Sequence, residues 1–434
     1  MKSFWFILIV SFLTFSCVTQ KPKSTKNKIL DDKLNSLKLL ENSFVGIKVL
    51  DPSTQEVLYS LNEKKYFTPA SNTKILTLYS GLKTLGDSIP GLKYTFKNDT
   101  LFIAGTADPT FLHPDFEPSK TLDFLRKYNN KTIVFSDSNF QNETLGSGWS
   151  WDDYNDDYQV ELSSFPISGN IVRFKNAKGE TTLNPKYFKD SIFNKDSQLD
   201  FIKRNINENV FYTNSGILNN KKFSQDIPFK TSTSLIKALL EDTLKRNIAL
   251  KHFKIDSSFK TIYSLPVDTV YRRMMKISDN MLAEHLLLLA GGKFSDTISS
   301  SKSIQNIQKA YFSEMPQPFN WVDGSGLSRY NLFTPESLVF LLEKMLKDFS
   351  QERIFPLMAI GGQAGTLNSI YKSPRPFVFA KSGSMSGVYN QSGYLISKKG
   401  KLLIFSIMNN NFTGSISKYR NLTSEIIQVF YENY

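Results

Sequence analysis

The chain has few of the residues that build disulfides and metal sites. Cys17 is the only cysteine in 434 residues, so an intramolecular disulfide is excluded and stability must come from the hydrophobic core. The three histidines, His113, His252 and His285, lie far apart and form no His-x-x-x-His pair, so no metal site is expected. No Walker or dinucleotide-binding glycine motif follows a predicted strand, so no cofactor is expected either.

Long apolar runs are also scarce. One run, from Phe4 to Phe15, follows Lys2 and ends at Ser16-Cys17. It is too short for a stable membrane span, so residues 1–16 are predicted to be a signal peptide of the lipoprotein type. Leu13 to Cys17 resembles a bacterial lipoprotein processing site, where the cysteine is lipidated. The alternative is a signal peptide that is cut elsewhere and discarded with its cysteine. Both readings predict an exported protein, and the first predicts a periplasmic one held to the membrane by a lipid on Cys17.

Acidic residues are outnumbered, with 40 against 53 basic ones and a net charge of +13. Such a balance favours anionic partners such as membrane headgroups or wall polymers. The charge is spread along the chain, however, and lysines cluster tightly only within residues 17–30, which are interpreted as a solvated tether. A nucleic-acid partner is not expected for an exported chain. The length suggests two or three domains of roughly 150 residues each.

A strand-to-helix transition occurs at Pro69-Ala70-Ser71-Asn72-Thr73-Lys74. Thr68 precedes a proline and favours extended backbone, whereas the apolar residues after Ser71 recur at helical spacing as far as Gly86. Three residues on, the Lys74 amine lies within hydrogen-bond reach of the Ser71 hydroxyl. A partly buried lysine can act as the base that a serine nucleophile needs. The alternative is that Ser71 is a helix cap, because serines near helix starts usually are.

The two ends of the chain are expected to share one sheet. Strands are predicted at residues 44–50 and 56–60 before Ser71, and at residues 377–383, 393–397 and 402–408 near the other end. Short turns between successive strands imply antiparallel pairing. Residues 31–86 and 265–434 are therefore predicted to form one discontinuous domain, closed by a helix over residues 416–430.

The intervening residues 87–264 have a different texture, with short hydrophobic runs and frequent Asn and Asp. Hairpins are predicted around Asn98-Asp99 and Lys178-Gly179, a strand at residues 131–135 and a helix at residues 232–245. Long structureless loops are uncommon inside compact domains. The segment is therefore predicted to be an inserted, mostly β region.

Two further short motifs follow in the second half of the chain. Ser278-x-Asn280 lies where two predicted helices meet, and Lys381-Ser382-Gly383 lies on a predicted strand. Each motif is common by chance, and even Ser-x-x-Lys recurs here, at Ser80, Ser234 and Ser369. Their order and structural context together resemble the penicillin-recognition serine enzymes.

The resemblance is narrower than that superfamily. Asp323 to Arg329 reads DGSGLSR, Gly365 to Leu367 reads GTL, and Gly148 to Asp153 is rich in tryptophan. These segments are similar to those of the low-molecular-mass class C penicillin-binding proteins, the D-alanyl-D-alanine carboxypeptidase and endopeptidase family. The resemblance covers nearly all of the predicted mature chain. It implies an α/β penicillin-recognition fold, with an antiparallel sheet flanked by helices.

The resemblance also implies catalytic roles. Ser71 would attack the D-Ala-D-Ala carbonyl while Lys74 accepts its proton. Ser278 and Lys381 would relay the proton to the leaving D-alanine, the charge of Lys381 helping to keep Lys74 neutral, and Asn280 would hold the substrate amide. Water would then hydrolyse the acyl-enzyme.

Substrate contacts are implied at the third motif and in the insertion. Ser382, Gly383 and Ser384 would bind substrate, with the backbone amides of Ser71 and Ser384 forming the oxyanion hole. By motif position Asp153 and Arg329 would read the diamino acid of the stem peptide, with Tyr158 nearby. The alternatives are a surface acid for Asp153 and a structural salt bridge for Arg329.

The partners implied are peptidoglycan peptides as substrates and β-lactams as inhibitors. Two other functions stay open: a β-lactamase or esterase on the same fold, and a non-catalytic wall-binding lipoprotein. The first would need its own activator of the deacylating water, and no Glu-x-x-Leu-Asn type loop lies between Ser278 and Lys381. The second is disfavoured because all three motifs are retained.

Overall fold

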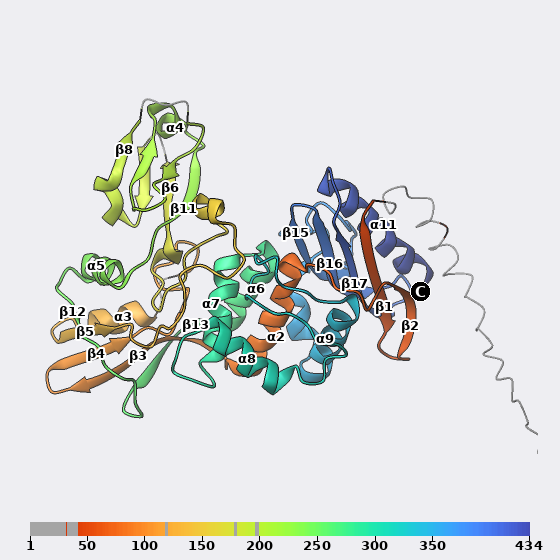
Figure 1. Ribbon diagram of the computed structural model, residues 1–434, viewed down its shortest axis with the longest axis horizontal. Helices are drawn as coiled ribbons and strands as arrows, with labels where there is room; N and C mark the ends of the chain where they lie inside the picture. The colour runs from red at the N-terminus through yellow and green to blue at the C-terminus, as the bar shows by residue number, and fades with distance from the viewer. Residues whose placement is uncertain (1–31, 33–41, 118–119, 178–179, 196–198) are drawn as a thin grey trace, which may run out of the picture.

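The computed structural model describes residue 32 and residues 42–117, 120–177, 180–195 and 199–434 (Figure 1). The predicted signal peptide, Cys17, the tether and the Lys178-Gly179 turn lie outside these residues. Within the described chain, no helix combines the length and the apolar character that a membrane crossing requires.

A six-stranded antiparallel sheet joins the two ends of the chain, as the sequence predicts. Its strand order is β14-β15-β16-β17-β1-β2, so the red β1 lies beside the blue β17 in Figure 1. The strands are β1 (Phe44–Asp51), β2 (Glu56–Leu61), β14 (Ala359–Ile360), β15 (Val378–Met385), β16 (Val388–Ile396) and β17 (Leu402–Asn410).

One strand starts earlier than expected. β16 begins at Val388 rather than at Gly393. The polar run from Asn390 to Ser392 breaks the apolar alternation that marks a strand, yet these side chains are buried within the protein. Asn390 Nδ2, for example, donates to the carbonyl oxygen of Thr68 over 2.8 Å and so fixes the chain just before the Ser71 turn.

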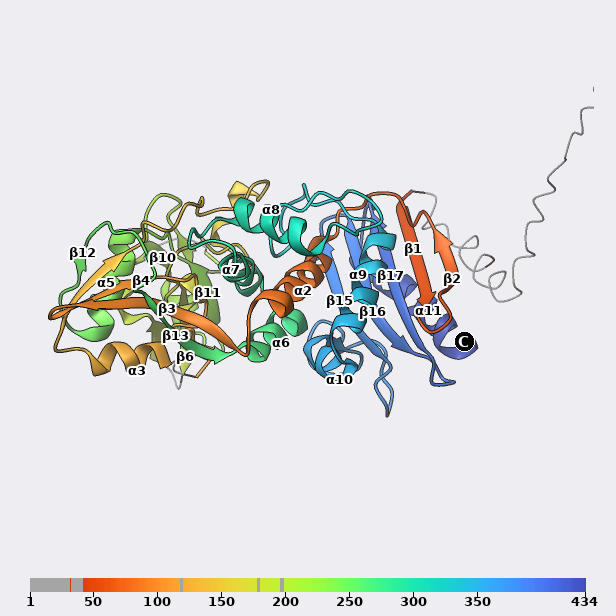
Figure 2. The ribbon, with the colours of Figure 1, turned by 90° about the horizontal axis from the view of Figure 1, so that it is seen from below.

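The sheet is covered on both faces because its side chains alternate between two cores. Along β17, Leu403, Phe405 and Ile407 pack with the closing helix α11 (Ile416–Asn433), whereas Ile404 and Met408 pack with the helical layer on the other side. Figure 2 shows the sheet between these layers.

The helical layer carries the first two motifs. It contains the 3₁₀ turn η2 (Ala70–Thr73), α2 (Lys74–Thr84), α6 (Val267–Ile277), α7 (Asn280–Gly291), α8 (Ser300–Tyr311), α9 (Pro335–Asp348), α10 (Gln351–Ile354) and η6 (Phe355–Leu357). Helix α7 is buried from Met281 to Gly291, which holds the preceding Ser278-Asp279-Asn280 junction against the core.

The region between α2 and α6 begins with strand β3 and ends with strand β13, which are neighbours in one sheet. β3 (Ser88–Lys97) pairs antiparallel with β13 (Lys260–Pro266) in a five-stranded sheet of order β12-β5-β4-β3-β13. The other members are β4 (Thr100–Ala104), β5 (Thr132–Ser136) and β12 (Ala249–Leu250), with α3 (Lys120–Lys127) and α5 (Thr233–Leu244) beside them.

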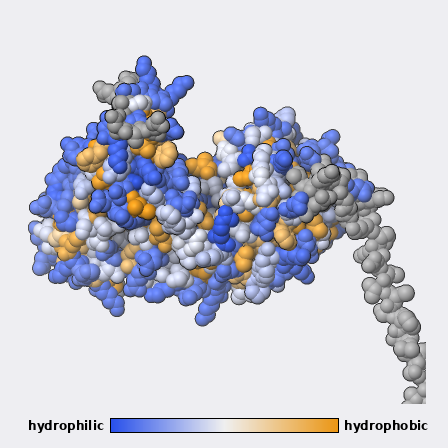
Figure 3. Space-filling model, turned by 45° about the horizontal axis from the view of Figure 1, so that its top comes forward, coloured by the Kyte–Doolittle hydropathy of each residue, from blue (hydrophilic) through white to orange (hydrophobic). Residues whose placement is uncertain are grey.

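Two smaller sheets rise from this region at the upper left of Figure 1. One has the order β11-β6-β7 and the other β8-β10-β9, and both share a hydrophobic core with the five-stranded sheet. Figure 3 shows a hollow between this projection and the six-stranded sheet. The elements are β6 (Ile171–Ala177), β7 (Glu180–Asn184), β8 (Ile192–Asn194), β9 (Lys203–Arg204), β10 (Phe211–Thr213), α4 (Ser215–Asn219) and β11 (Ser224–Pro228), with the 3₁₀ turns η3 (Trp151–Asn155), η4 (Ser168–Asn170) and η5 (Lys186–Ser191).

Candidate active site

Ser71 lies in the 3₁₀ turn that leads directly into α2. The residue before it, Ala70, has a φ of +47°, a left-handed conformation that costs a non-glycine residue about 1 to 3 kcal/mol. The glycine-rich loop, residues 323–329, packs on this turn, because a β-carbon at Gly326 would lie 1.8 Å from the Ala70 carbonyl oxygen. Packing by the glycine-rich loop therefore helps to keep the turn in a backbone conformation that its own residue types disfavour.

The Lys74 amine is fully buried beneath Ser71. Its Nζ donates to Ser71 Oγ over 3.0 Å, to Asn280 Oδ1 over 2.6 Å and to the Ser325 carbonyl oxygen over 2.8 Å. Burial lowers the pKa of Lys74 to about 8, while nearby carboxylates, Glu284 foremost, act in the opposite direction. The contact between Ser71 and Lys74 is the one that the Ser-x-x-Lys spacing predicts.

The second motif lies at the junction of α6 and α7. Ser278 ends α6 in a left-handed conformation, with a φ of +67°. Asp279 caps α7 by accepting from the Leu282 amide over 3.1 Å. Asn280 spans the site, since its Oδ1 faces Lys74 and its Nδ2 donates to the Tyr158 carbonyl oxygen over 3.0 Å.

The third motif lies on β15, as predicted. Lys381 is fully buried and its Nζ donates to the Ser382 carbonyl oxygen over 2.6 Å. Ser382 Oγ donates to Thr366 Oγ1 over 2.8 Å. Burial, and then the neighbouring Lys74, hold the pKa of Lys381 well below its usual range. The charge on Lys381 is thus less stable in the substrate-free protein than the sequence prediction assumes.

Gly383 brings β15 against the Ser71 turn. A β-carbon there would lie 2.7 Å from the Pro69 carbonyl oxygen and 2.9 Å from the Ser71 nitrogen. Only glycine permits this approach, which places the strand that continues to Ser384 beside the Ser71 amide. The two backbone amides predicted to form an oxyanion hole therefore belong to segments in direct contact.

A cavity of about 580 Å³ opens above these groups. Its lining includes predicted site residues from all three motifs and from the insertion: Ser71, Asp153, Tyr158, Ser278, Asn280, Arg329, Ser382 and Ser384. Lys74 and Lys381 are fully buried beneath it, whereas Ser71 and Ser278 are partly exposed. A larger cavity of about 820 Å³ lies beyond the glycine-rich loop and includes none of the predicted site residues.

A segment of the insertion that includes Asp153 and Tyr158 forms one rim of the cavity. Asp153 is partly buried, and burial with neighbouring acids raises the pKa of its carboxyl. The Tyr158 hydroxyl donates to Asp156 over 3.2 Å. Arg329 is exposed on another part of the lining and donates to the Ser386 carbonyl oxygen over 3.3 Å, an interaction with backbone rather than the salt bridge weighed as an alternative.

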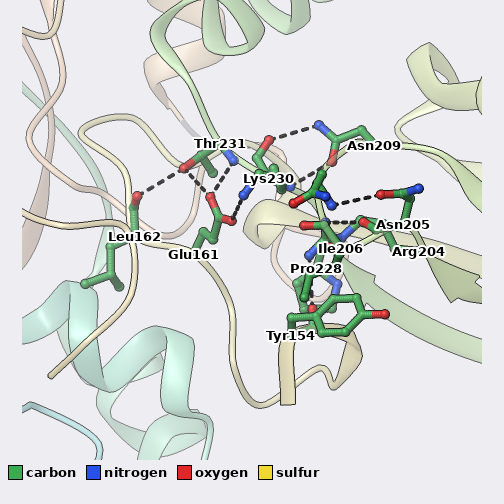
Figure 4. A network of polar contacts seen from close by, with 11 residues as sticks. Tyr154, Glu161, Leu162, Arg204, Asn205, Ile206, Asn209, Pro228, Lys230 and Thr231 are labelled. Carbon is green, nitrogen blue, oxygen red and sulfur yellow. Dashed lines mark hydrogen bonds and ion pairs between the residues drawn. The ribbon is translucent and has the colours of Figure 1, made fainter. Parts of the chain in front are cut away.

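Arg204, on β9 of the projecting region, makes hydrogen bonds to the segment that carries Asp153 (Figure 4). It is only 2% exposed and donates to the carbonyl oxygens of Pro228 over 2.7 Å and of Tyr154 over 3.2 Å. Its backbone amide donates to Asn155 Oδ1 over 2.7 Å. The segment that carries Asp153 is therefore held from within the insertion as well as by the bond from Asn280 to the Tyr158 carbonyl oxygen.

Several residues in contact with the motifs were missed from the sequence. Ser325 acts through its backbone carbonyl, so its residue type carries no signal. Glu284 and Asp323 bind backbone amides of the glycine-rich loop. Thr366 lies in the GTL segment. The sequence showed that this segment is similar to the family's, but not that Thr366 contacts Ser382.

Comparison with known proteins identifies the family. The model of the D-Ala-D-Ala carboxypeptidase 3 (S13) family matches residues 26–430. The chain belongs to this family. It is therefore a serine-type peptidase of the D-Ala-D-Ala carboxypeptidase class. Similar relatives include the D-alanyl-D-alanine carboxypeptidase DacB of Haemophilus influenzae, 23% identical over 87% of this chain and 88% of the relative. The penicillin-sensitive carboxypeptidase A of Dictyostelium discoideum is 23% identical over 92% of this chain and 90% of the relative.

Solved structures show the fold. Penicillin-binding protein 4 (dacB) of Haemophilus influenzae superposes with a TM-score of 0.73 at 20% identity, over 94% of this chain and 99% of that one. The S13 chain thus has the predicted penicillin-recognition fold. The individual roles of the site residues stay predictions, for which the structure supplies positions.

Replacing Gly383 tests the contact between β15 and the Ser71 turn. We expect Gly383→Ala to slow labelling of the protein by a fluorescent penicillin at least about tenfold, because the added methyl group must push the two segments apart. Gly86→Ala is the control, since no atom lies within 4 Å of a β-carbon there. Equal labelling of the two folded variants would contradict the close approach.

Replacing Arg204 tests the support of the rim. Arg204→Met leaves buried carbonyl oxygens without donors, so the melting temperature should fall and KM for a peptide substrate should rise roughly 3- to 10-fold, with kcat changed less. Arg126→Met, at an exposed position of α3, should change neither quantity. An unchanged KM in Arg204→Met would show that the rim does not depend on this side chain.

Proposed function

We propose that this S13 peptidase acts on peptidoglycan through an acyl-enzyme on Ser71. It releases the terminal D-alanine of stem peptides, cleaves the D-alanyl bond of cross-links, or does both. The observation that carries the proposal is the 3.0 Å contact between Ser71 Oγ and the buried Lys74 amine, at the floor of a cavity open to solvent. A nucleophile in reach of a desolvated base is the arrangement that covalent catalysis requires.

In the proposed reaction Ser71 Oγ attacks the D-Ala-D-Ala carbonyl carbon while its proton passes to Lys74 Nζ. The amides of Ser71 and Ser384 stabilise the oxyanion, an effect worth about 3 to 4 kcal/mol per donor in other enzymes. The bond to the leaving nitrogen then breaks as that nitrogen receives the proton by way of Ser278. Water hydrolyses the resulting ester and restores Ser71.

The cavity lining supports a charged peptide as the substrate. Asp153 and Arg329 lie on the same cavity and present opposite charges. An ammonium group fits the acidic rim, and a carboxylate fits the exposed guanidinium. A diamino acid of the stem peptide can present both groups at its free end. We therefore assign recognition of this residue to Asp153 and Arg329, with Tyr158 placed beside the acid.

β-Lactams are proposed as inhibitors of the same serine. A solved relative, penicillin-binding protein 4 of Haemophilus influenzae, has been seen in complex with a β-lactam. Among other solved relatives, Bd3459 of Bdellovibrio bacteriovorus, described as a peptidoglycan endopeptidase, has a TM-score of 0.52 over 89% of this chain and 93% of that one. Terminal trimming and cleavage of cross-links are therefore both within the proposal.

The chain provides a matched control for the nucleophile. Ser369-x-x-Lys372 has the spacing of Ser71-x-x-Lys74, but Ser369 is exposed. We expect Ser71→Ala to lower D-alanine release from a pentapeptide at least about a thousandfold and Ser369→Ala to leave it unchanged. Substantial release by Ser71→Ala would contradict the assignment, and release from a cross-linked dimer in the same assay would identify endopeptidase activity.

We also propose that the protein is a periplasmic lipoprotein anchored through Cys17. The support is the short apolar run that ends at this single cysteine. Expressed in bacteria with its leader, the wild type should incorporate labelled palmitate and sediment with membranes, and Cys17→Ser should do neither. A soluble, unlabelled wild type that begins beyond residue 17 would favour a cleaved signal peptide instead.

A further inference from the structure

Glu284 is a buried carboxylate that the proposed reaction does not use. It lies on α7, one turn after Asn280, and is 2% exposed. Its Oε2 accepts from the Gly324 amide over 3.0 Å and its Oε1 from the Ser325 amide over 2.7 Å. Both oxygens are thus bonded to the glycine-rich loop, as in an ionised carboxylate.

The same loop connects Glu284 to the general base. The Ser325 amide donates to Glu284 Oε1, and the Ser325 carbonyl oxygen accepts from Lys74 Nζ over 2.8 Å. The neighbouring Gly324 carbonyl oxygen accepts from Thr77 Oγ1 on α2 over 2.6 Å. Only the backbone of Ser325 therefore lies between the Glu284 carboxylate and the Lys74 amine. Hydrogen bonds from α2 and to α7 hold this part of the loop in place.

Other charged groups around this pair have their own partners. Asp323, on the loop, accepts from the amides of Gly326 and Ser328 and from Trp149 Nε1. Asp279, at the α6–α7 junction, is paired with Arg273 over 3.1 Å. Lys381, on β15, donates to the Ser382 carbonyl oxygen, and the charge of Lys74 lowers its pKa. His285, next to Glu284 on α7, bonds the Met281 carbonyl oxygen.

The electrostatics couple Glu284 to Lys74. Burial and the Asp323 carboxylate raise the pKa of Glu284 to about 8. Among the charged groups that raise the pKa of Lys74, Glu284 has the largest effect. The amide donors of Gly324 and Ser325 act in the opposite direction and favour the ionised carboxylate. Once ionised, its charge favours the ammonium form of Lys74, the form produced when Lys74 takes the serine proton.

We propose that Glu284 is a positioning residue of the acylation step, which holds the Ser325 carbonyl against Lys74 and supplies the negative charge that stabilises Lys74 once it is protonated. The inference rests on the proposed role of Lys74 as proton acceptor. In that step the bond from Ser71 Oγ to the carbonyl carbon forms, and the proton moves from Oγ to Nζ. Glu284 neither gains nor loses a proton, and acts as the orienting third group of a nucleophile–base pair.

The test is the pH dependence of acylation by a penicillin, followed by time-resolved intact mass spectrometry on the full mature protein. In the wild type the second-order rate should rise with pH through about 8, because Lys74 accepts a proton only when its amine is neutral. In Glu284→Gln the rise should shift downward by about one pH unit, since an opposing charge is lost. Its plateau should fall at least about tenfold, since a weaker base is a poorer proton acceptor.

Two further variants distinguish the loss of the Glu284 charge from a general effect on folding. Glu284→Asp keeps the charge, so its rise should stay within about 0.3 pH units of wild type even if shortening lowers the rate. Glu343→Gln removes another buried carboxylate, which lies on α9 and is bonded to Gln55 and Lys347, and should change neither rise nor plateau.

The outcomes are distinct. A Glu284→Gln profile that falls equally at every pH, with its rise unmoved, would overturn the inference and leave Glu284 a purely structural residue. So would a Glu284→Asp profile whose rise lies about one pH unit below that of the wild type, a comparison that also decides the matter should Glu284→Gln not fold. A wild type that is not acylated at any pH would overturn the proposed function instead.

Discussion

Burial of the Lys74 amine is the constraint on which the rest of the site depends. An ammonium group out of contact with water is costly unless it is paired and hydrogen-bonded, and the free energy is lowered if it loses its proton. Here three oxygen acceptors surround Nζ, one from each of three separate segments. The helix start, the α6–α7 junction and the glycine-rich loop must all be in place for the amine to be satisfied.

The same demand explains the close backbone contacts around Ser71. Gly326 and Gly383 approach the turn from opposite segments at distances that no β-carbon allows. Ala70 keeps a left-handed conformation that its residue type disfavours. Strain of this kind persists only where surrounding structure fixes it, and the buried helix α7 and the central strands of the six-stranded sheet provide that support.

Local pattern was enough to predict the main strands of the six-stranded sheet and the order of the motifs, because the motifs lie at a helix start, at a junction between two helices and on a strand, all of which local sequence marks. The contact between Ser71 and Lys74 was predictable from helical geometry alone. The roles of Ser325 and Glu284 were not, because they are exerted through backbone groups of a distant loop. The early start of β16 was missed because its buried polar residues, such as Asn390, mimic a loop until their partners are known.

The most direct test of the acyl-enzyme is to locate it. Treatment of the folded wild type with a penicillin, digestion with trypsin and fragmentation by mass spectrometry will show which side chain carries the adduct. The account predicts modification of Ser71, within the peptide that ends at Lys74. An adduct on another residue, such as Ser278, or no adduct with no turnover of the penicillin, would contradict it.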